Sequence, residues 1–229
     1  MKKSNKLFLG GFLTVMLMIT GIHVALFAKY KNGKYTIYHP QDKREQYMRS
    51  FPNVLFVTVR DVRGATIQFG DIAEVEKGKE DVIQYVQKGD SLIITGSDSD
   101  DQPDGRRLLN FTLPYNATLS AENSLIYFEK GKKNAQPDLV IHLQRSHAIF
   151  FEPAMPFLLG HVKVVASDSS IAAFQGITQV NNLEVQLSNS ALEYNEGNAG
   201  QLSIVTDSIS RLSLQSKNLL KAKITTISN

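Results

Sequence analysis

The last third of the chain repeats itself about every 20 residues, and this repeat restricts the fold more than any other feature of the sequence. Each copy contains a short strand with alternating apolar residues, a small polar corner with Asp or Asn, and a second apolar stretch. The copies span residues 162–171, 183–192 and 202–212, and a truncated copy spans residues 222–227. Repeats of this kind, in which each copy buries its apolar side against the next, are typical of solenoids. The sequence therefore predicts an all-β fold, a parallel β-helix or β-solenoid with one rung per repeat.

The apolar positions can be aligned back to about residue 119. The first apolar position recurs after 22, 23, 21, 19 and 20 residues, at Leu119, Ile141, Val164, Val185, Ile204 and Ile224. Two residues later the chain has Ala121, Leu143, Ala166, Leu187 and Thr206, and the second apolar stretch is aligned on Ile171, Leu192 and Leu212. Because alternate residues of a strand point to one side, we expect these side chains to stack in a dry core. Asp168, Asn189 and Asp207 are predicted at the corners, since Asp and Asn tolerate left-handed backbone angles.

The part of the chain before the repeat is also rich in strands. Runs of β-branched and aromatic residues, bounded by Gly, Asp and Lys, occupy residues 54–59, 66–69, 82–86 and 91–95. Residues 107–113 are expected to return antiparallel to residues 91–95. We expect a strand-rich N-terminal part of the β domain over residues 53–118, forming a cap, and solenoid rungs over residues 119–229. An antiparallel sandwich is the competing interpretation, and the matched corners favour the solenoid.

A run of 22 residues without a formal charge, residues 7–28, predicts a transmembrane anchor between a basic flank (residues 1–6) and a juxtamembrane linker (residues 29–52). As a helix it would measure roughly 33 Å, enough to cross a hydrocarbon core of about 30 Å. A cleaved signal peptide is the alternative, but its apolar region is usually about 7–15 residues long. Residues 26–28 (Leu-Phe-Ala) also lack the small-x-small pattern that favours cleavage.

The charge pattern does not decide the orientation of this anchor or indicate a nucleic-acid partner. Lysines lie in nearly equal numbers on both sides of the span, so the positive-inside rule gives little information. N-terminal anchors usually place a large following domain outside, and we expect a single-pass protein with its main domain on the outer side of the membrane. Six of the lysines precede residue 35; without them, 19 basic and 22 acidic residues remain. The basic isoelectric point therefore reflects the N-terminal lysines, and we expect no nucleic-acid partner.

The sequence contains no motif from which a catalytic, cofactor or metal site can be predicted, and we expect none. The absence of cysteine excludes disulfides, thiolate metal sites and a cysteine nucleophile. His142 and His147 are five residues apart, a spacing that places them on opposite faces of an ideal strand. An acid-rich turn loosely resembles a calcium loop but is better interpreted as a solvated hairpin loop; its acids are Asp98, Asp100, Asp101 and Asp104.

A carbohydrate-active β-helix would need carboxylates clustered at one strand position of neighbouring rungs. The outward row that the alignment predicts holds Lys163, Glu184 and Ser203, which is a mixed set. Glu193 and Glu196 are close in sequence but lie around a predicted turn. An enzyme is therefore the less favoured alternative.

The repeat at residues 183–192 (LEVQLSNSAL) and its two neighbours resemble the bacterial family of auto-transporter adhesin head GIN domains. The strands between residues 56 and 95 resemble the opening of that family, so the resemblance covers roughly residues 53–229. It implies an extracytoplasmic β-solenoid of the bacterial envelope. Members of the family commonly carry Gly at the polar corner, where this chain has Asp or Asn, and the family has no active site to transfer.

Together with the resemblance, these observations predict a membrane-anchored, non-enzymatic binding or scaffold protein of the bacterial cell envelope. We expect it in the inner membrane, with its main domain periplasmic or otherwise extracytoplasmic. Its partners would be the membrane, through residues 7–28, and an unknown envelope protein or glycan. Residues 224–229 are expected to form an open last strand with no helix after it, and open strand edges favour pairing with another chain. A homo-oligomer through this C-terminal edge strand is therefore expected, or a partner that covers it. The alternative is an accessory subunit of an envelope membrane complex, in which the anchor itself takes part in recognition.

Overall fold

The computed structural model describes residues 3–31, 48–76, 83–96, 109–130 and 135–227. The chain forms two compact units, Met1–Arg44 and Glu45–Asn229. The first contains α1 (Lys3–Lys31), in which Leu9–Lys29 is long and apolar enough to cross a membrane, with a mean hydropathy of 2.0 and no burial. A signal sequence would meet the same criteria. The acid-rich turn and most of the linker lie outside the described residues, and Met48 begins a strand.

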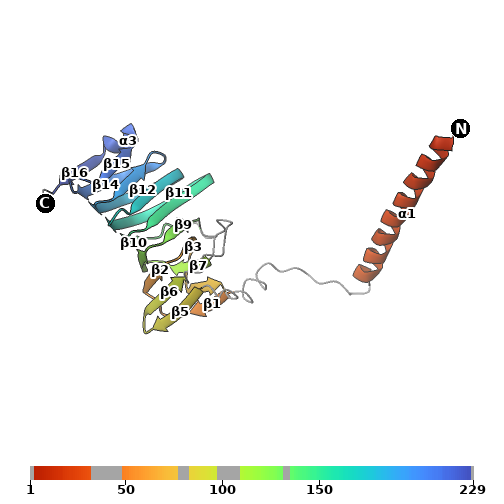
Figure 1. Ribbon diagram of the computed structural model, residues 1–229, viewed down its shortest axis with the longest axis horizontal. Helices are drawn as coiled ribbons and strands as arrows, with labels where there is room; N and C mark the ends of the chain where they lie inside the picture. Colours follow the sequence, from red (N-terminus) through yellow and green to blue (C-terminus); the bar gives the residue numbers. More distant parts are fainter. Residues whose placement is uncertain (1–2, 32–47, 77–82, 97–108, 131–134, 228–229) are drawn as a thin grey trace. The chain divides into compact units, whose positions relative to one another are not determined.

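The second unit is a β-solenoid of about five turns, as the repeat predicts. Strands from successive turns pair in parallel and form ladders along its length (Figure 1). One ladder consists, in spatial order, of β6 (Ser91–Gly96), β2 (Phe56–Arg60), β8 (Thr118–Glu122), β10 (Leu139–Gln144), β11 (His147–Ser167), β12 (Ile171–Ser188), β14 (Asn198–Thr206) and β16 (Ala222–Thr226).

A second ladder forms another side of the solenoid. It consists of β7 (Leu109–Pro114), β3 (Ala65–Gly70), β9 (Leu125–Phe128), the first parts of β11 and β12, β13 (Ala191–Tyr194) and β15 (Arg211–Leu214). The long strands β11 and β12 continue around a corner, so each contributes to both ladders and to a third side between them. A register shift between Glu152 and Phe157 marks the bend in β11.

The register of the first ladder confirms the predicted stack. Ile141 pairs with Leu119 on one side and Val164 on the other, and the series continues through the later rungs in the predicted order. Asp168 and Asn189 have the expected left-handed backbone, with φ of 56° and 47°. The third predicted corner residue, Asp207, is not among the described residues with positive φ.

The predicted alignment of the second apolar stretch is wrong by one residue in one rung. Ile171 pairs with Ala191, and its neighbour Ala172 is the residue that aligns with Leu192 and so points into the core. The corner before β12 contains one residue more, and two of its residues, Asp168 and Ser169, have a left-handed backbone. That insertion moves the following strand by one position and reverses its faces.

The N-terminal cap is present, but the prediction that residues 107–113 pair with residues 91–95 is wrong. Strands β6 and β7 belong to different ladders and pair in parallel with β2 and β3. Strands β6 and β7 therefore form the rung outside the one formed by β2 and β3, although they follow it in sequence. Antiparallel strands cover this end: β5 (Ile83–Lys88) pairs with β6, and β4 (Ala73–Glu76) joins β7 to β1 (Met48–Phe51).

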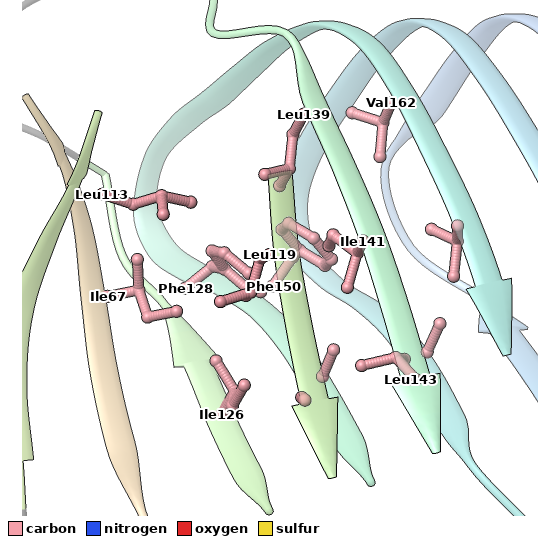
Figure 2. Packing of buried hydrophobic residues seen from close by; sticks show 14 of the residues in the cluster. Ile67, Leu113, Leu119, Ile126, Phe128, Leu139, Ile141, Leu143, Phe150 and Val162 are labelled. Carbon is pink, nitrogen blue, oxygen red and sulfur yellow. The ribbon is translucent and has the colours of Figure 1, made fainter. Parts of the chain in front are cut away.

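The core between the ladders is apolar and contains a continuous stack of aromatic rings. Phe150 lies between Phe128 and Phe174, with ring centroids 4.3 and 4.5 Å away and nearly parallel planes. Tyr194 extends the stack at 5.0 Å, and its hydroxyl donates to the Thr178 carbonyl. Figure 2 shows Phe150 among the aliphatic side chains that converge from both ladders. Stacked ring pairs contribute about 0.5–1.5 kcal/mol each beyond their burial, so this column ties successive rungs together.

Candidate binding surfaces

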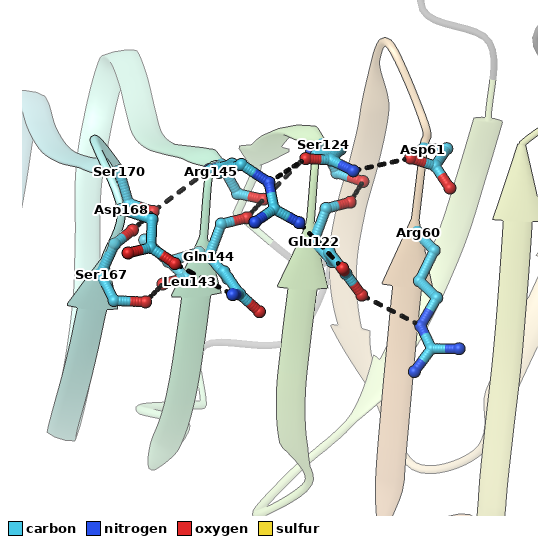
Figure 3. A network of polar contacts seen from close by, with 12 residues as sticks. Arg60, Asp61, Glu122, Ser124, Leu143, Gln144, Arg145, Ser167, Asp168 and Ser170 are labelled. Carbon is cyan, nitrogen blue, oxygen red and sulfur yellow. Dashed lines mark hydrogen bonds and ion pairs between the residues drawn. The ribbon is translucent and has the colours of Figure 1, made fainter.

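A polar corner runs along the outside of the solenoid where the first ladder turns into the second. The residues at its tip have left-handed backbones in successive rungs; they are Asp61, Asn123, Arg145, Asp168 and Asn189. Three of these side chains contact one another in the network of Figure 3: Asn123 donates to Asp61 over 3.0 Å, and Arg145 donates to Asn123 over 2.7 Å. Arg145 and Arg60 both pair with Glu122 at N–O distances of 3.0 and 3.3 Å. These groups are partly solvated, so the pairs contribute about 0–1 kcal/mol each.

A ladder of serines lies immediately inside this corner. Its members are the buried Ser124, Ser146, Ser170 and Ser190 and the half-buried Ser210. The backbone N–H of Ser124 donates to Ser146 Oγ over 3.0 Å, and that hydroxyl donates to the Gln144 carbonyl over 2.8 Å. The same arrangement links Ser146 to Ser170 and Ser190 to Ser210. The hydroxyls thus satisfy backbone groups that the turn removes from the ladders, and this corner stabilises the fold rather than offering free groups to a ligand.

The last of these corners differs from the others because a carboxylate closes it. Asp207 accepts hydrogen bonds from the backbone N–H groups of Ser210 and Ile209 in its own turn, at 2.8 and 3.3 Å. Its other oxygen accepts the N–H of Asn189, one rung earlier, at 2.7 Å. The hydrogen bond from the Ser210 side chain, followed by these backbone donors, lowers the pKa of Asp207 below its usual value, against a smaller opposing effect of burial.

The described histidines of the solenoid lie apart from one another. His142 lies on β10 and His147 begins β11, and both are exposed on different sides of the corner between the two strands. His161 is half-buried, with Nδ1 2.9 Å from the Asn182 amide and Nε2 3.9 Å from Glu184. Among the described residues, no group of three or more His, Asp or Glu side chains is arranged to hold a metal ion.

The outward row predicted from the alignment is present. Lys163 pairs with Glu184, which in turn pairs with Ser203, so the row has mixed chemistry and no stacked carboxylates. Glu184 belongs to the first ladder, whereas Glu193 belongs to the second. The two glutamates therefore do not share a site.

A shallow depression of about 270 Å³ lies over the second ladder and brings Glu193 and Glu196 together. It is also lined by Phe151, Phe174, Gln175 and Asn195. The Gly176 N–H donates to one Glu196 carboxylate oxygen over 2.7 Å, and Ser213 donates to Asn195 over 2.7 Å. An exposed ring beside amide and carboxylate oxygens can contact the faces and hydroxyls of a sugar. The two glutamates alone did not predict this depression, because Phe151, Phe174 and Gln175 come from two neighbouring rungs.

The two ends of the solenoid differ in how they cover the apolar core. At the end closed by β1, β4 and β5, core residues such as Ile94 and Phe111 are buried. At the other end, Ile224 is 41% exposed, whereas Ile204, at the same position one rung earlier, is fully buried. Leu220, which follows α3 (Ser216–Leu219), is 89% exposed. The described residues therefore leave the core open at the β15–β16 end.

One side of this open end is closed by α3, which precedes the last strand and was not predicted. Asn218 of α3 is fully buried, accepts the Ala199 N–H at 3.1 Å and lies 3.4 Å from the Tyr194 carbonyl. Lys221 donates to the Asn198 side chain and the Ala199 carbonyl. Helix α3 thus supplies hydrogen-bond partners to backbone groups on the third side of the preceding rung. Strands β15 and β16 remain the outermost described strands of their ladders.

Comparison with known proteins gives only distant similarities of fold. No family model and no curated protein matches the chain. A solved structure of a candidate lipid binding protein from Parabacteroides distasonis ATCC 8503 has 9% identity and a TM-score of 0.40, and the match covers 79% of this chain and 92% of that one. A candidate adhesin from Bacteroides fragilis NCTC 9343 has 11% identity and a TM-score of 0.29, with 80% and 96% covered. The GIN-domain family therefore stays a resemblance based on the repeat.

Proposed function

We propose that this chain is a non-enzymatic binding or scaffold protein of the bacterial cell envelope, anchored in the inner membrane with its β-solenoid on the extracytoplasmic side. The observation that carries the proposal is the asymmetry of the solenoid: the core is covered at one end and open at the other. Monomeric soluble proteins seldom leave a contiguous apolar surface uncovered unless it binds something. The repeat's resemblance to GIN domains supports the envelope location.

The N-terminal segment supports anchoring by its length and apolarity. Leu9–Lys29 comprises 21 helical residues, none of them buried within the structure. A protein-tagged chain in a Gram-negative host should remain in the membrane pellet after alkaline carbonate washing. Protease added to spheroplasts should digest the solenoid of intact chains. Release of the solenoid as a shorter soluble species would instead identify residues 7–28 as a cleaved signal.

The binding role is tested by site-specific photo-crosslinking in cells that produce the full chain. A benzophenone residue at position 224 samples the open end, one at position 151 samples the depression, and one at position 186 samples an exposed part of the first ladder as control. Crosslinks at 224 or 151 that are absent at 186 support a binding surface. If none of the three positions gives a specific crosslink, the proposed function is contradicted.

An accessory role in a membrane complex is a second candidate, favoured by the fully exposed apolar face of α1. Replacing residues 7–28 with an unrelated span separates the two: loss of the partner indicates recognition through the anchor, and retention indicates recognition through the solenoid. The depression with Glu193 and Glu196 is the feature that would serve a polysaccharide-active enzyme. Turnover of an envelope polysaccharide that is lost in Glu193→Gln would establish that alternative.

A further inference from the structure

We propose that the open end formed by β15, α3 and β16 binds an extended acidic segment of a partner protein, which adds to the solenoid as a further strand beside β16. This inference rests on the proposed binding function and names the chemistry of the partner. It follows from three properties of the last rung: its free strand edge, its exposed apolar row and its uniformly basic charge.

The free edge can be assigned to particular backbone groups. The Ile227 N–H donates to the Thr206 carbonyl of β14 at 2.8 Å. Consecutive residues of a strand direct their backbone groups to opposite edges. Ile224 and Thr226 therefore direct theirs away from β14, and within the described part of the chain β16 pairs with β14 alone. These groups are available to a strand that is added at this edge.

The exposed apolar row sets the pattern that an added strand needs. Every rung of the first ladder presents an apolar residue at the position of Ile224, and each earlier one is buried by the next rung. An incoming strand covers Ile224 if it carries an apolar residue opposite it. The residues before and after that apolar residue then point outward, and one of them lies beside Lys223.

The charge of this end selects an acidic partner. Arg211, Lys217, Lys221 and Lys223 are all exposed, and no Asp or Glu follows Asp207 in the sequence. Lys223 extends the outward row of Lys163, Glu184 and Ser203, so the next residue in that row lies beside a cation. Opposite charges facing each other on adjacent strands are stabilising and like charges are destabilising. An alternation of acidic and apolar residues therefore fits this edge.

The same charge argues against a second copy of the chain as the occupant. Two copies joined through β16 would bring together eight basic side chains from this end, with no acidic residue after Asp207 on either copy to compensate. An acidic strand from a different protein satisfies the edge, the apolar row and the charge together.

The test uses the full chain in non-ionic detergent and two labelled peptides, one of alternating Glu and Val and one of alternating Lys and Val. Fluorescence anisotropy should show binding of the Glu peptide, weakened by salt, and at least tenfold weaker binding of the Lys peptide. Lys223→Glu should weaken the Glu peptide roughly tenfold, since an attractive cross-strand pair becomes repulsive. Lys163→Glu, the same change in the same outward row of an inner rung, is the matched control and should leave affinity unchanged.

A second variant tests the strand edge itself. Thr226→Pro removes an outward N–H without removing a donor to β14, and should weaken the Glu peptide roughly fivefold or more while circular dichroism stays unchanged. Equal binding of the two peptides, or equal loss in Lys163→Glu and Lys223→Glu, would overturn the inference. So would a concentration-dependent dimer, seen by analytical ultracentrifugation, that Thr226→Pro dissociates.

The photo-crosslinking experiment separates this inference from the proposed function. Crosslinks at position 151 but not at 224 leave a binding protein whose partner uses the depression, and overturn the inference alone. Crosslinks at 224 to a peptide rich in Asp or Glu, identified by mass spectrometry, support both.

Discussion

The aromatic column in the core provides the sharpest test of the fold, because neighbouring residues on one strand have opposite environments. Phe150 is fully buried between two stacked rings, whereas Phe151 is 42% exposed. Truncating Phe150 to alanine loses the burial of its ring, about 1.5–3 kcal/mol. It also loses two stacked contacts, about 0.5–1.5 kcal/mol each. The expected loss is about 3–5 kcal/mol, the range for Phe→Ala in packed cores.

The measurement is urea unfolding of the full chain in non-ionic detergent, followed by far-ultraviolet circular dichroism. Phe150→Ala should lower the free energy of unfolding by about 3–5 kcal/mol, which is a fifth or more of the about 5–15 kcal/mol typical of folded domains. Phe151→Ala is the matched control and should cost about 1 kcal/mol or less, as expected for a surface position. Equal losses, or a larger loss at Phe151, would refute the assigned register, because a one-residue slip exchanges the two faces of the strand.

Three further predictions concern the polar corner. Ser146→Ala should lower the free energy of unfolding by about 2–3 kcal/mol in the same assay, because it leaves the buried Ser124 N–H without its acceptor. Ser188 is exposed, and Ser188→Ala should change the free energy of unfolding by no more than about 0.5 kcal/mol. Similar values for both variants would contradict a structural serine ladder. Because the folded-state pKa of Asp207 is lowered, its contribution is complete above the unfolded value of about 3.9 and is lost as the pH falls through the folded value. Asp207→Asn should therefore destabilise the chain at pH 7 and differ progressively less from the wild type as the pH falls below about 4; a constant difference would refute this linkage. Glu122→Gln should change stability by about 1 kcal/mol or less despite its two arginine partners, since both pairs are solvated, and a larger loss would show that the pairs are coupled to the fold.

The main ladder could be predicted from the sequence because each rung buries one strongly apolar residue in the same register. Leu119 through Ile224 occupy a position at which every strand must present an apolar side chain to its neighbours. The aromatic and serine ladders repeat with the same intervals and were missed. The aromatic residues resemble any other apolar residue in an alternating strand, and serine fits a surface turn as well as a buried corner.

The errors come from features that leave no periodic signal. The second left-handed residue at the 168–169 corner adds one residue to its turn, and nothing in the local composition distinguishes it from the shorter corner at Arg145. The placement of β2 between β6 and β8 is a long-range pairing that the alternation of either strand fits equally well. The depression escaped prediction for a related reason: its residues become neighbours only when three rungs stack.

The closed end of the solenoid indicates what completion of the open end would require. In a stacked array each rung is stabilised by its interfaces with two neighbours, and a terminal rung lacks one of them. At the closed end β5 supplies that interface: it pairs antiparallel with β6 from Ile83 to Lys88, and Ile83 becomes buried as it does so. Strand β16 lacks this interface: its Ile224 is exposed, whereas Leu92 of β6, in the same inward row at the closed end, is buried. A partner strand that follows the alternation of β5, with acidic residues on its outward face, therefore gains the interface energy that β5 provides at the closed end.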